Sequence, residues 1–188
     1  LGGHYVMLHT TLTAAEGDDF LTGNDFRQIG LVRDPYNFGT TTISTATTLR
    51  AVKAIKLASG AGTFQADEKI TQATTGAIGK VVEYDSTNRI LYYQQEKFTD
   101  FGVASDGDKI AFSGTNTITG ATSSATGAPD DGADSAVTLT GGNTITFTDG
   151  FANEEIEPDS GDLMYFETRR PISRATDQTE DIKLIIEF

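Results

Sequence analysis

The chain has 188 residues, enough for one large or two small domains, and its 20 glycines with 37% hydrophobic residues favour a β-rich, loop-rich protein over a helical one. Its net charge of −13 argues against binding to nucleic acid or to an anionic membrane surface, because both require a basic face. Cysteine is absent, which excludes disulfides and a cysteine nucleophile, and no stretch has the roughly 20 apolar residues that a membrane span needs.

Strands are expected at the start of the chain. Residues 4–12 (HYVMLHTTL) alternate as a strand does, and Gly and Asp turn chemistry follows them. Residues 26–32 (FRQIGLV) return to strand character and stop at Asp34-Pro35. Residues 40–49 (TTTISTATTL) are rich in β-branched residues and alternate in phase, so they predict a further strand.

The next stretch, residues 50–57 (RAVKAIKL), continues this alternation. A short helix is the alternative, since Leu49, Val52 and Lys56 also share a helical face. The β-branched residues that lead into the stretch favour a strand.

A hairpin is predicted in the middle of the chain. Residues 77–95 (AIGKVVEYDSTNRILYYQQ) contain two β-rich runs on either side of an Asp-Ser-Thr-Asn turn. A faint internal echo surrounds it, because the stretches that begin at Phe64 and Phe101 each contain an acidic turn, a Lys-Ile step and a Thr/Gly/Ala-rich run. The unequal spacing gives little support to a duplication, but such short hairpins suit a small barrel or sandwich.

The least structured part is expected at residues 113–135. This stretch (SGTNTITGATSSATGAPDDGADS) has no Lys or Arg and little bulk to bury, which predicts a flexible loop. A second hairpin is expected across Gly141-Gly142, and strands over 163–167 and 182–188 finish the chain.

The expected fold is all-β, because no long helical period occurs in the sequence. We expect residues 1–57 and 150–188, which contain the bulkier apolar strands, to pair into a β-sandwich scaffold. Residues 58–149 would then form an inserted β-rich lobe, a small barrel or sandwich, with the flexible loop 113–135.

Residues that carry catalytic or metal chemistry are sparse. The two histidines, His4 and His9, lie five apart on a predicted strand and so on opposite faces, which prevents shared ligation of one metal. The acidic loop with Asp130, Asp131 and Asp134 is a weak calcium candidate, since it lacks EF-hand spacing and solvated turn residues explain it better. No nucleophile elbow or phosphate-binding loop occurs, so we expect no enzyme and no cofactor.

An arginine-rich linker stands out near the C-terminus of this acidic chain. Its first two arginines precede a proline, which fixes an extended or turned backbone. Two interpretations remain open: a solvated turn whose exposed ion pairs contribute about 0–1 kcal/mol each, or guanidinium groups that bind carboxylates across a protein interface. The candidate interface residues are Arg169, Arg170, Arg174, Asp177 and Glu180.

Both ends of the chain carry a family resemblance. Residues 161–188 (GDLMYFETRRPISRATDQTEDIKLIIEF) resemble the C-terminus of the baseplate wedge proteins encoded by gene eight of T4-type contractile-tailed bacteriophages. Residues 24–47, with a FRQIGL strand, an Asp-Pro turn and a Thr-rich run, are similar to the same family. The resemblance implies a non-enzymatic virion protein based on a β-sandwich, which is a homodimer within each wedge and packs against other wedge subunits. It would be assembled in the host cytoplasm, with Arg169, Arg170 and Arg174 near a subunit boundary.

The middle of the chain is not covered by this resemblance. The chain also starts at Leu1 rather than Met, so we expect a fragment or a processed product. An alternative function therefore stays open, a tail-associated β module that binds a glycan or calcium. In that case Tyr84, Tyr92 and Tyr93 would stack on a sugar, but hairpin packing explains these tyrosines equally well.

Overall fold

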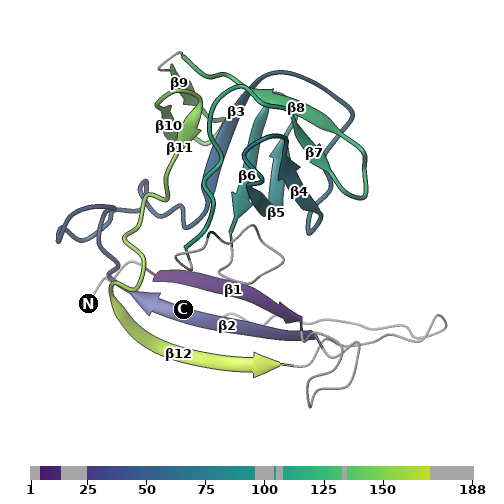
Figure 1. Cartoon of the computed structure of the whole chain (residues 1–188). Helices are drawn as coiled ribbons and strands as arrows, with labels where there is room; N and C mark the ends of the chain where they lie inside the picture. The colour runs from purple at the N-terminus through teal and green to yellow at the C-terminus, as the bar shows by residue number, and fades with distance from the viewer. Residues whose placement is uncertain (1–4, 14–24, 96–103, 105–107, 133–134, 170–188) are drawn as a thin grey trace.

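Every regular element is a β-strand in the part of the chain that the structure describes. The structure is a computed structural model and describes residues 5–13, 25–95, 104, 108–132 and 135–169 (Figure 1). The strands in chain order are β1 (Tyr5–Thr13), β2 (Asp25–Arg33), β3 (Lys53–Ala61), β4 (Lys69–Gln72), β5 (Ile78–Asp85), β6 (Ile90–Gln94), β7 (Ile118–Gly120), β8 (Thr126–Pro129), β9 (Ser135–Thr138), β10 (Thr144–Phe147), β11 (Phe151–Ala152) and β12 (Asp162–Arg169). The all-β class expected from the sequence is confirmed.

The two ends of the chain meet in one three-stranded antiparallel sheet with the order β1-β2-β12. Val32 in the central strand β2 has Val6 of β1 on one side and Leu163 of β12 on the other. A β-bulge between Leu163 and Tyr165 interrupts the register of β12. The expected pairing of N- and C-terminal strands is confirmed for these three strands, and the strand predicted at 182–188 lies outside the described residues.

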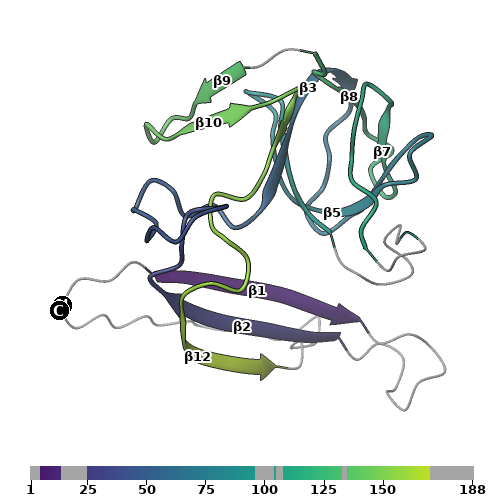
Figure 2. The same cartoon turned by 60° about the vertical axis from the view of Figure 1, so that its left-hand side comes forward.

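The lobe above this sheet is a ring of strands that closes on β3. Its order is β3-β6-β5-β4-β7-β8, and β8 pairs back onto β3. The ring can close because β3 is long, so that residues 53–56 pair with β6 while residues 57–61 pair with β8. Figure 2 shows this small barrel above the sheet, with the β9–β10 hairpin at its flank. The inserted β-rich lobe expected from the sequence is therefore a closed barrel.

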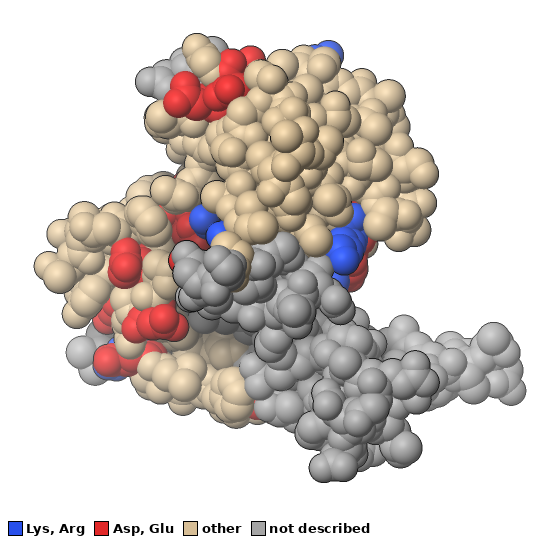
Figure 3. All heavy atoms as spheres, viewed as in Figure 1, with Lys and Arg blue, Asp and Glu red and all other residues tan. Residues whose placement is uncertain are grey.

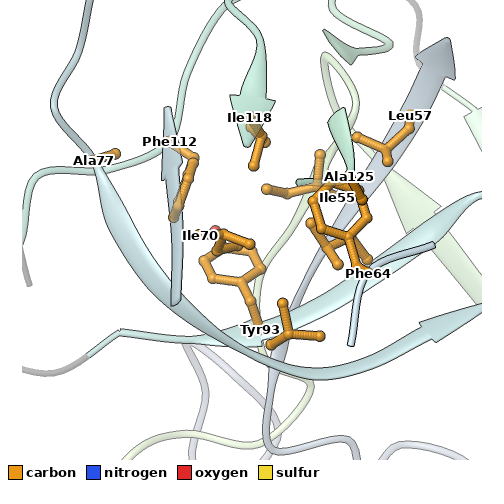
Figure 4. Packing of buried hydrophobic residues seen from close by; sticks show 11 residues of the cluster. Ile55, Leu57, Phe64, Ile70, Ala77, Tyr93, Phe112, Ile118 and Ala125 are labelled. Carbon is orange, nitrogen blue, oxygen red and sulfur yellow. The ribbon is translucent and has the colours of Figure 1, made fainter. Parts of the chain in front are cut away.

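An apolar core fills the barrel, and Figure 4 shows its side chains pointing toward one another from several strands. Side chains alternate along β3, so Ile55 and Leu57 belong to the barrel core, whereas Ala54 packs in a second cluster with Ile145 and Phe147 of the β9–β10 hairpin. Full burial of an isoleucine, leucine or phenylalanine side chain contributes about 1.5–3 kcal/mol to the free energy of unfolding. The barrel core consists of Ile55, Leu57, Phe64, Ile70, Ala77, Val81, Leu91, Tyr93, Phe112, Ile118 and Ala125.

Two segments of the barrel are repeats of each other at a distance of 48 residues. Both begin with a buried phenylalanine in an edge-to-face aromatic contact, with ring centroids 5.3 Å apart for Phe64–Tyr84 and 4.9 Å apart for Phe112–Tyr93. The equivalent strands β4 and β7 pair antiparallel with Thr71 opposite its counterpart in β7. The sequence echo is therefore real but in a different register, because Phe64 corresponds to Phe112 and not to Phe101.

The turns that follow β4 and β7 share the same hydrogen bonds. The backbone N–H of Gln72 donates to the Ala77 carbonyl at 2.8 Å, and the equivalent backbone N–H of Gly120 donates to the Ala125 carbonyl at 2.9 Å. A pseudo-twofold pair of hairpins thus builds one side of the barrel.

The prediction of a flexible loop at residues 113–135 is wrong. This stretch contains β7 and β8, and Ile118 and Ala125 within it are buried in the core. Its small residues do not lack packing but permit close approach, since a Cβ at Gly127 would lie only 2.6 Å from the Leu57 side chain.

The strand predicted at residues 40–49 is also wrong. Threonine hydroxyls there bind the local backbone and side chains instead, as Thr48 Oγ1 accepts from the Thr45 amide at 2.9 Å and donates to Asn37 Oδ1 at 2.9 Å. The strand predicted at 50–57 is present as β3, but it belongs to the barrel. The lobe therefore begins before residue 58 and extends past residue 149, to β11.

We expect Gly60→Ala to destabilise the protein, because a Cβ at Gly60 would overlap the carbonyl oxygen of Thr126 where β3 and β8 close the barrel. The backbone at this contact cannot move without opening the ring, so the cost is about 1–3 kcal/mol in the free energy of unfolding, measured by urea denaturation. Gly141→Ala is the matched control, since nothing lies within 4 Å of a Cβ there. Equal stabilities of the two variants would contradict this closure.

Candidate functional site

A buried carboxylate lies at one turn of the barrel repeat. Glu68 is 4% exposed, and its Oε1 accepts hydrogen bonds from the Gln65 amide and the Ser123 hydroxyl, both at 2.7 Å. Its Oε2 accepts from the amides of Thr122 at 3.0 Å and Ser123 at 2.9 Å. Gly120 leaves room for this carboxylate, because a Cβ there would lie 2.7 Å from it.

The hydrogen bonds keep Glu68 charged. Burial by itself raises the pKa of this carboxyl, but the hydrogen bonds from Ser123, Gln65 and Thr122 together outweigh it, and the net result is a lowered pKa. Both oxygens are occupied by donors, so no lone pair is left for a substrate proton. Glu68 therefore fastens the turn after β7 to the start of β4, and its burial is explained without a catalytic role.

Gln72 fills the corresponding space at the other turn. Its Oε1 accepts from the Thr75 hydroxyl at 2.9 Å and the Ser113 amide at 3.0 Å, and its Nε2 donates to the Asn116 carbonyl at 3.1 Å. The two most buried polar side chains of the repeat are thus both satisfied structural groups.

The weak metal candidates do not gather into a site. Asp130 and Asp131 follow β8, where the Asp130 amide donates to the Lys56 carbonyl at 2.9 Å, and Asp134 lies outside the described residues. Within the described ranges, no group of three or more His, Cys, Asp or Glu side chains comes together.

The tyrosines named for the alternative glycan site are packed into the barrel. Tyr92 and Tyr93 are buried, and burial raises the pKa of Tyr93. The ring of Tyr84 stands edge-on to Phe64. These contacts favour the hairpin-packing explanation over a sugar-stacking platform.

Among the described residues, the edge strand β12 carries the large apolar side chains with the highest exposed fractions. Leu163, Met164, Tyr165 and Phe166 are consecutive in β12, and each is between 51% and 63% exposed. After the β-bulge, Tyr165 and Phe166 are consecutive in the regular register and so point to opposite faces, which leaves apolar surface open on both sides of this edge. A strand edge of this kind is a ready template for pairing with another chain.

Charged residues lie at both ends of this apolar run. Asp162 accepts a hydrogen bond from Arg33 at 2.6 Å where β12 begins. Arg169, at the end of β12, lies opposite Arg27 of β2 in the register. The other candidate interface residues, Arg170, Arg174, Asp177 and Glu180, lie outside the described residues.

A second exposed apolar group lies on the segment between β2 and β3. Tyr36, Phe38 and Ile43 are all exposed, and Tyr36 and Ile43 form an isolated β-bridge. This segment is fastened to the chain before β12, since the Phe38 amide donates to the Glu155 carbonyl at 2.8 Å. The combined exposed apolar surface, here called the docking surface, consists of Tyr36, Phe38, Ile43, Leu163, Met164, Tyr165 and Phe166.

The density of charge in the arginine linker predicts the interface there, whereas the apolar residues beside it were not predicted to take part. The run LMYF was a signal, because four consecutive bulky residues cannot all be buried by a strand with one covered face.

No protein family, no curated protein and no solved structure matches the chain. The part of the chain that the structure describes contains no helix that is long and apolar enough to cross a membrane.

We expect Glu68→Gln to lower the free energy of unfolding by about 1–3 kcal/mol. The NH₂ group of the glutamine would face N–H and O–H donors from which the carboxylate now accepts hydrogen bonds. Glu83→Gln removes the same charge at an exposed position and should change stability by less than about 0.5 kcal/mol. Urea denaturation of both variants measures the difference.

The same variant removes a pH dependence. The pKa of Glu68 is lowered on folding, so its stabilising effect is complete above the pKa of the unfolded chain and is lost as the pH falls through the folded value. Wild-type protein should therefore lose more stability than Glu68→Gln on acidification below the ordinary glutamate range. If the free energy of unfolding fell equally with pH in the two proteins, Glu68 would not be the source of this pH dependence.

Proposed function

We propose that this protein is a structural subunit of a phage tail baseplate wedge and acts through protein–protein contacts in the virion. The observation that carries the proposal is the exposed apolar edge of β12, with which no other described strand than β2 pairs, in the sheet that joins the two ends of the chain. These are also the segments whose sequence resembles the gene-eight wedge proteins. An assembly role accounts for the edge because exposed strands of this kind are otherwise a liability for aggregation.

The proposed mode of contact is strand pairing along β12. An edge strand offers backbone donors and acceptors in a fixed spacing, and its apolar side chains add burial on both faces. Tyrosine, phenylalanine and methionine are enriched in protein interfaces, and all three occur in this run.

A second copy of the chain is the first partner that we propose. Antiparallel pairing of two β12 strands around Tyr165 and Phe166 would set Asp162 of each copy opposite Arg169 of the other. This arrangement gives Arg169 an opposite charge, which its neighbour Arg27 in the same sheet does not. The remaining docking surface, with Tyr36 and Phe38, is then available to other wedge subunits.

Phe166→Lys should break the proposed homodimer. A buried aromatic anchor of an interface is worth about 2 kcal/mol or more, and the symmetric dimer loses one from each copy, so the dimer dissociation constant should rise about 1000-fold. Sedimentation velocity over a concentration series measures it. Val82→Lys is the matched control, because Val82 is an exposed apolar residue of the barrel and not of the sheet. A monomeric wild-type chain, or equal dissociation constants for both variants, would reject strand pairing along β12.

Arg169→Glu should separate stability from assembly. The change places opposite charges at positions 27 and 169, so the free energy of unfolding should stay equal or rise by about 0.2–1 kcal/mol. Association with a second copy or with co-expressed wedge subunits should weaken, as it should for Arg170→Glu in the same linker. The readouts are urea denaturation and size-exclusion chromatography with light scattering. If both variants assembled as the wild type does, Arg169 and Arg170 would not contribute to the interface.

A further inference from the structure

A groove of about 500 Å³ lies where the sheet meets the segments that connect it to the barrel. Val32 of β2 and Leu163 of β12 line it from the sheet, and Pro35 and Ile156 line it from the two connecting segments. These four side chains give the groove an apolar floor next to the exposed edge of β12.

Hydrogen bonds between the two connecting segments hold the walls in place. The Glu157 amide donates to the Tyr36 carbonyl at 2.7 Å, and the Tyr36 amide donates to the Ser160 hydroxyl at 2.9 Å. The Gly39 amide donates to Glu157 Oε2 at 2.6 Å, which fixes this carboxylate as well. The groove is therefore formed before any ligand arrives, and binding does not have to pay for ordering it.

The charge of the groove is negative. Among the described residues that line it, Glu154, Glu157 and Asp159 are acidic and only Lys109 is basic. Neighbouring arginines are already engaged, because Arg50 lies 3.7 Å from Glu155 and Arg33 binds Asp162. Within the described part of the chain, none of the three lining carboxylates forms an ion pair.

Figure 3 shows how charged side chains are distributed over one face of the molecule. Acidic side chains gather on the connection between sheet and barrel, at the left of the view, and a second acidic group lies at the upper left of the barrel, whereas most of the remaining barrel surface in this view is uncharged. The excess of carboxylates around the groove therefore attracts cations to this part of the surface.

We propose that the groove binds an arginine- or lysine-containing segment of a partner protein, with large apolar residues next to the cation. The cationic head would meet Glu154 and Asp159, while its aliphatic stem and the neighbouring apolar side chains would cover Val32, Ile156 and Leu163. This inference deepens the proposed assembly function and rests on it, because it names the chemistry of a partner that docks beside β12.

A basic peptide segment fits the groove better than a metal ion does. Metal sites need several oxygen ligands around one point, and no such group is found among the described residues. The apolar floor would contribute nothing to a bound ion, whereas it buries the flanks of a peptide.

The test uses the full chain and a short fluorescent peptide in which two arginines are flanked by leucine and phenylalanine. Binding is followed by fluorescence anisotropy at two salt concentrations. Asp159→Asn and Glu154→Gln should each raise the dissociation constant by about 1.5- to 5-fold, and together by about tenfold. Asp159 has φ of +61°, which asparagine tolerates, so this variant should fold, and thermal melting checks it. Glu83→Gln, with the same charge change on the barrel, should bind the peptide as the wild type does.

Two matched peptides decide what is recognised. Replacing the arginines by glutamine, or the apolar residues by serine, should each abolish measurable binding. The proposal is overturned if Glu83→Gln weakens binding as much as Asp159→Asn does, since attraction to the acidic protein as a whole would then suffice. It is also overturned if the serine peptide binds equally well, or if the arginine peptide does not bind.

These outcomes are separate from those of the proposed function. The groove variants leave β12 unchanged, so the dimer measured by sedimentation should not respond to them. A chain that forms the β12 dimer but ignores the peptide would reject only the groove. A chain that binds the peptide but never self-associates would reject only the pairing along β12.

Discussion

The antiparallel pairing of β2 with β12 is the interaction on which the other features depend. It joins positions as distant as Arg33 and Asp162, which are 129 residues apart, so it closes the chain around the entire barrel. Closing so long a loop has an entropic cost that grows only slowly with length. Without β12, the N-terminal part would be a two-stranded hairpin, which is marginal alone in water. The same pairing creates the exposed edge and one wall of the acidic groove.

The barrel and the sheet differ in how much of their strand edges and apolar side chains is left exposed. In the barrel, strand closure leaves little free edge, and the polar side chains of Glu68 and Gln72 are consumed in holding its two equivalent turns. The sheet is the opposite case, with two edge strands and apolar side chains in contact with solvent. In the proposed assembly the sheet would make the contacts with partners, and the hydrogen bonds of Glu157 and Ser160 in the connecting segments would hold the barrel to that sheet.

Sequence periodicity found most strands because alternation is a local property. The strands β1, β2, β3 and β12 and the hairpins β5–β6 and β9–β10 were all predicted near their observed positions. The strands β7 and β8 were missed because Thr, Ser, Gly and Ala carry little hydrophobic signal, although Ile118 and Ala125 are among the most buried side chains. At residues 40–49 the error was of the opposite kind, since β-branched threonines favour strands but Thr45 and Thr48 use their hydroxyls to form turns. The repeat could be recognised in the sequence by aligning Phe64 with Phe112, but the Lys-Ile step favoured the wrong alignment, of Phe64 with Phe101.

Composition and local pattern by themselves determined the all-β class and the excess of negative charge, because strand alternation and charge are properties of individual residues and their near neighbours. Only the tertiary structure decided that β3 pairs with two different strands and so closes a barrel, that Gly120 makes room for Glu68, and that LMYF stays on an outer edge. It also decided that Glu154 and Asp159 share a groove with Val32. Each of these depends on contacts between residues far apart in the chain, and the energy of such contacts has no signature in any single stretch of sequence.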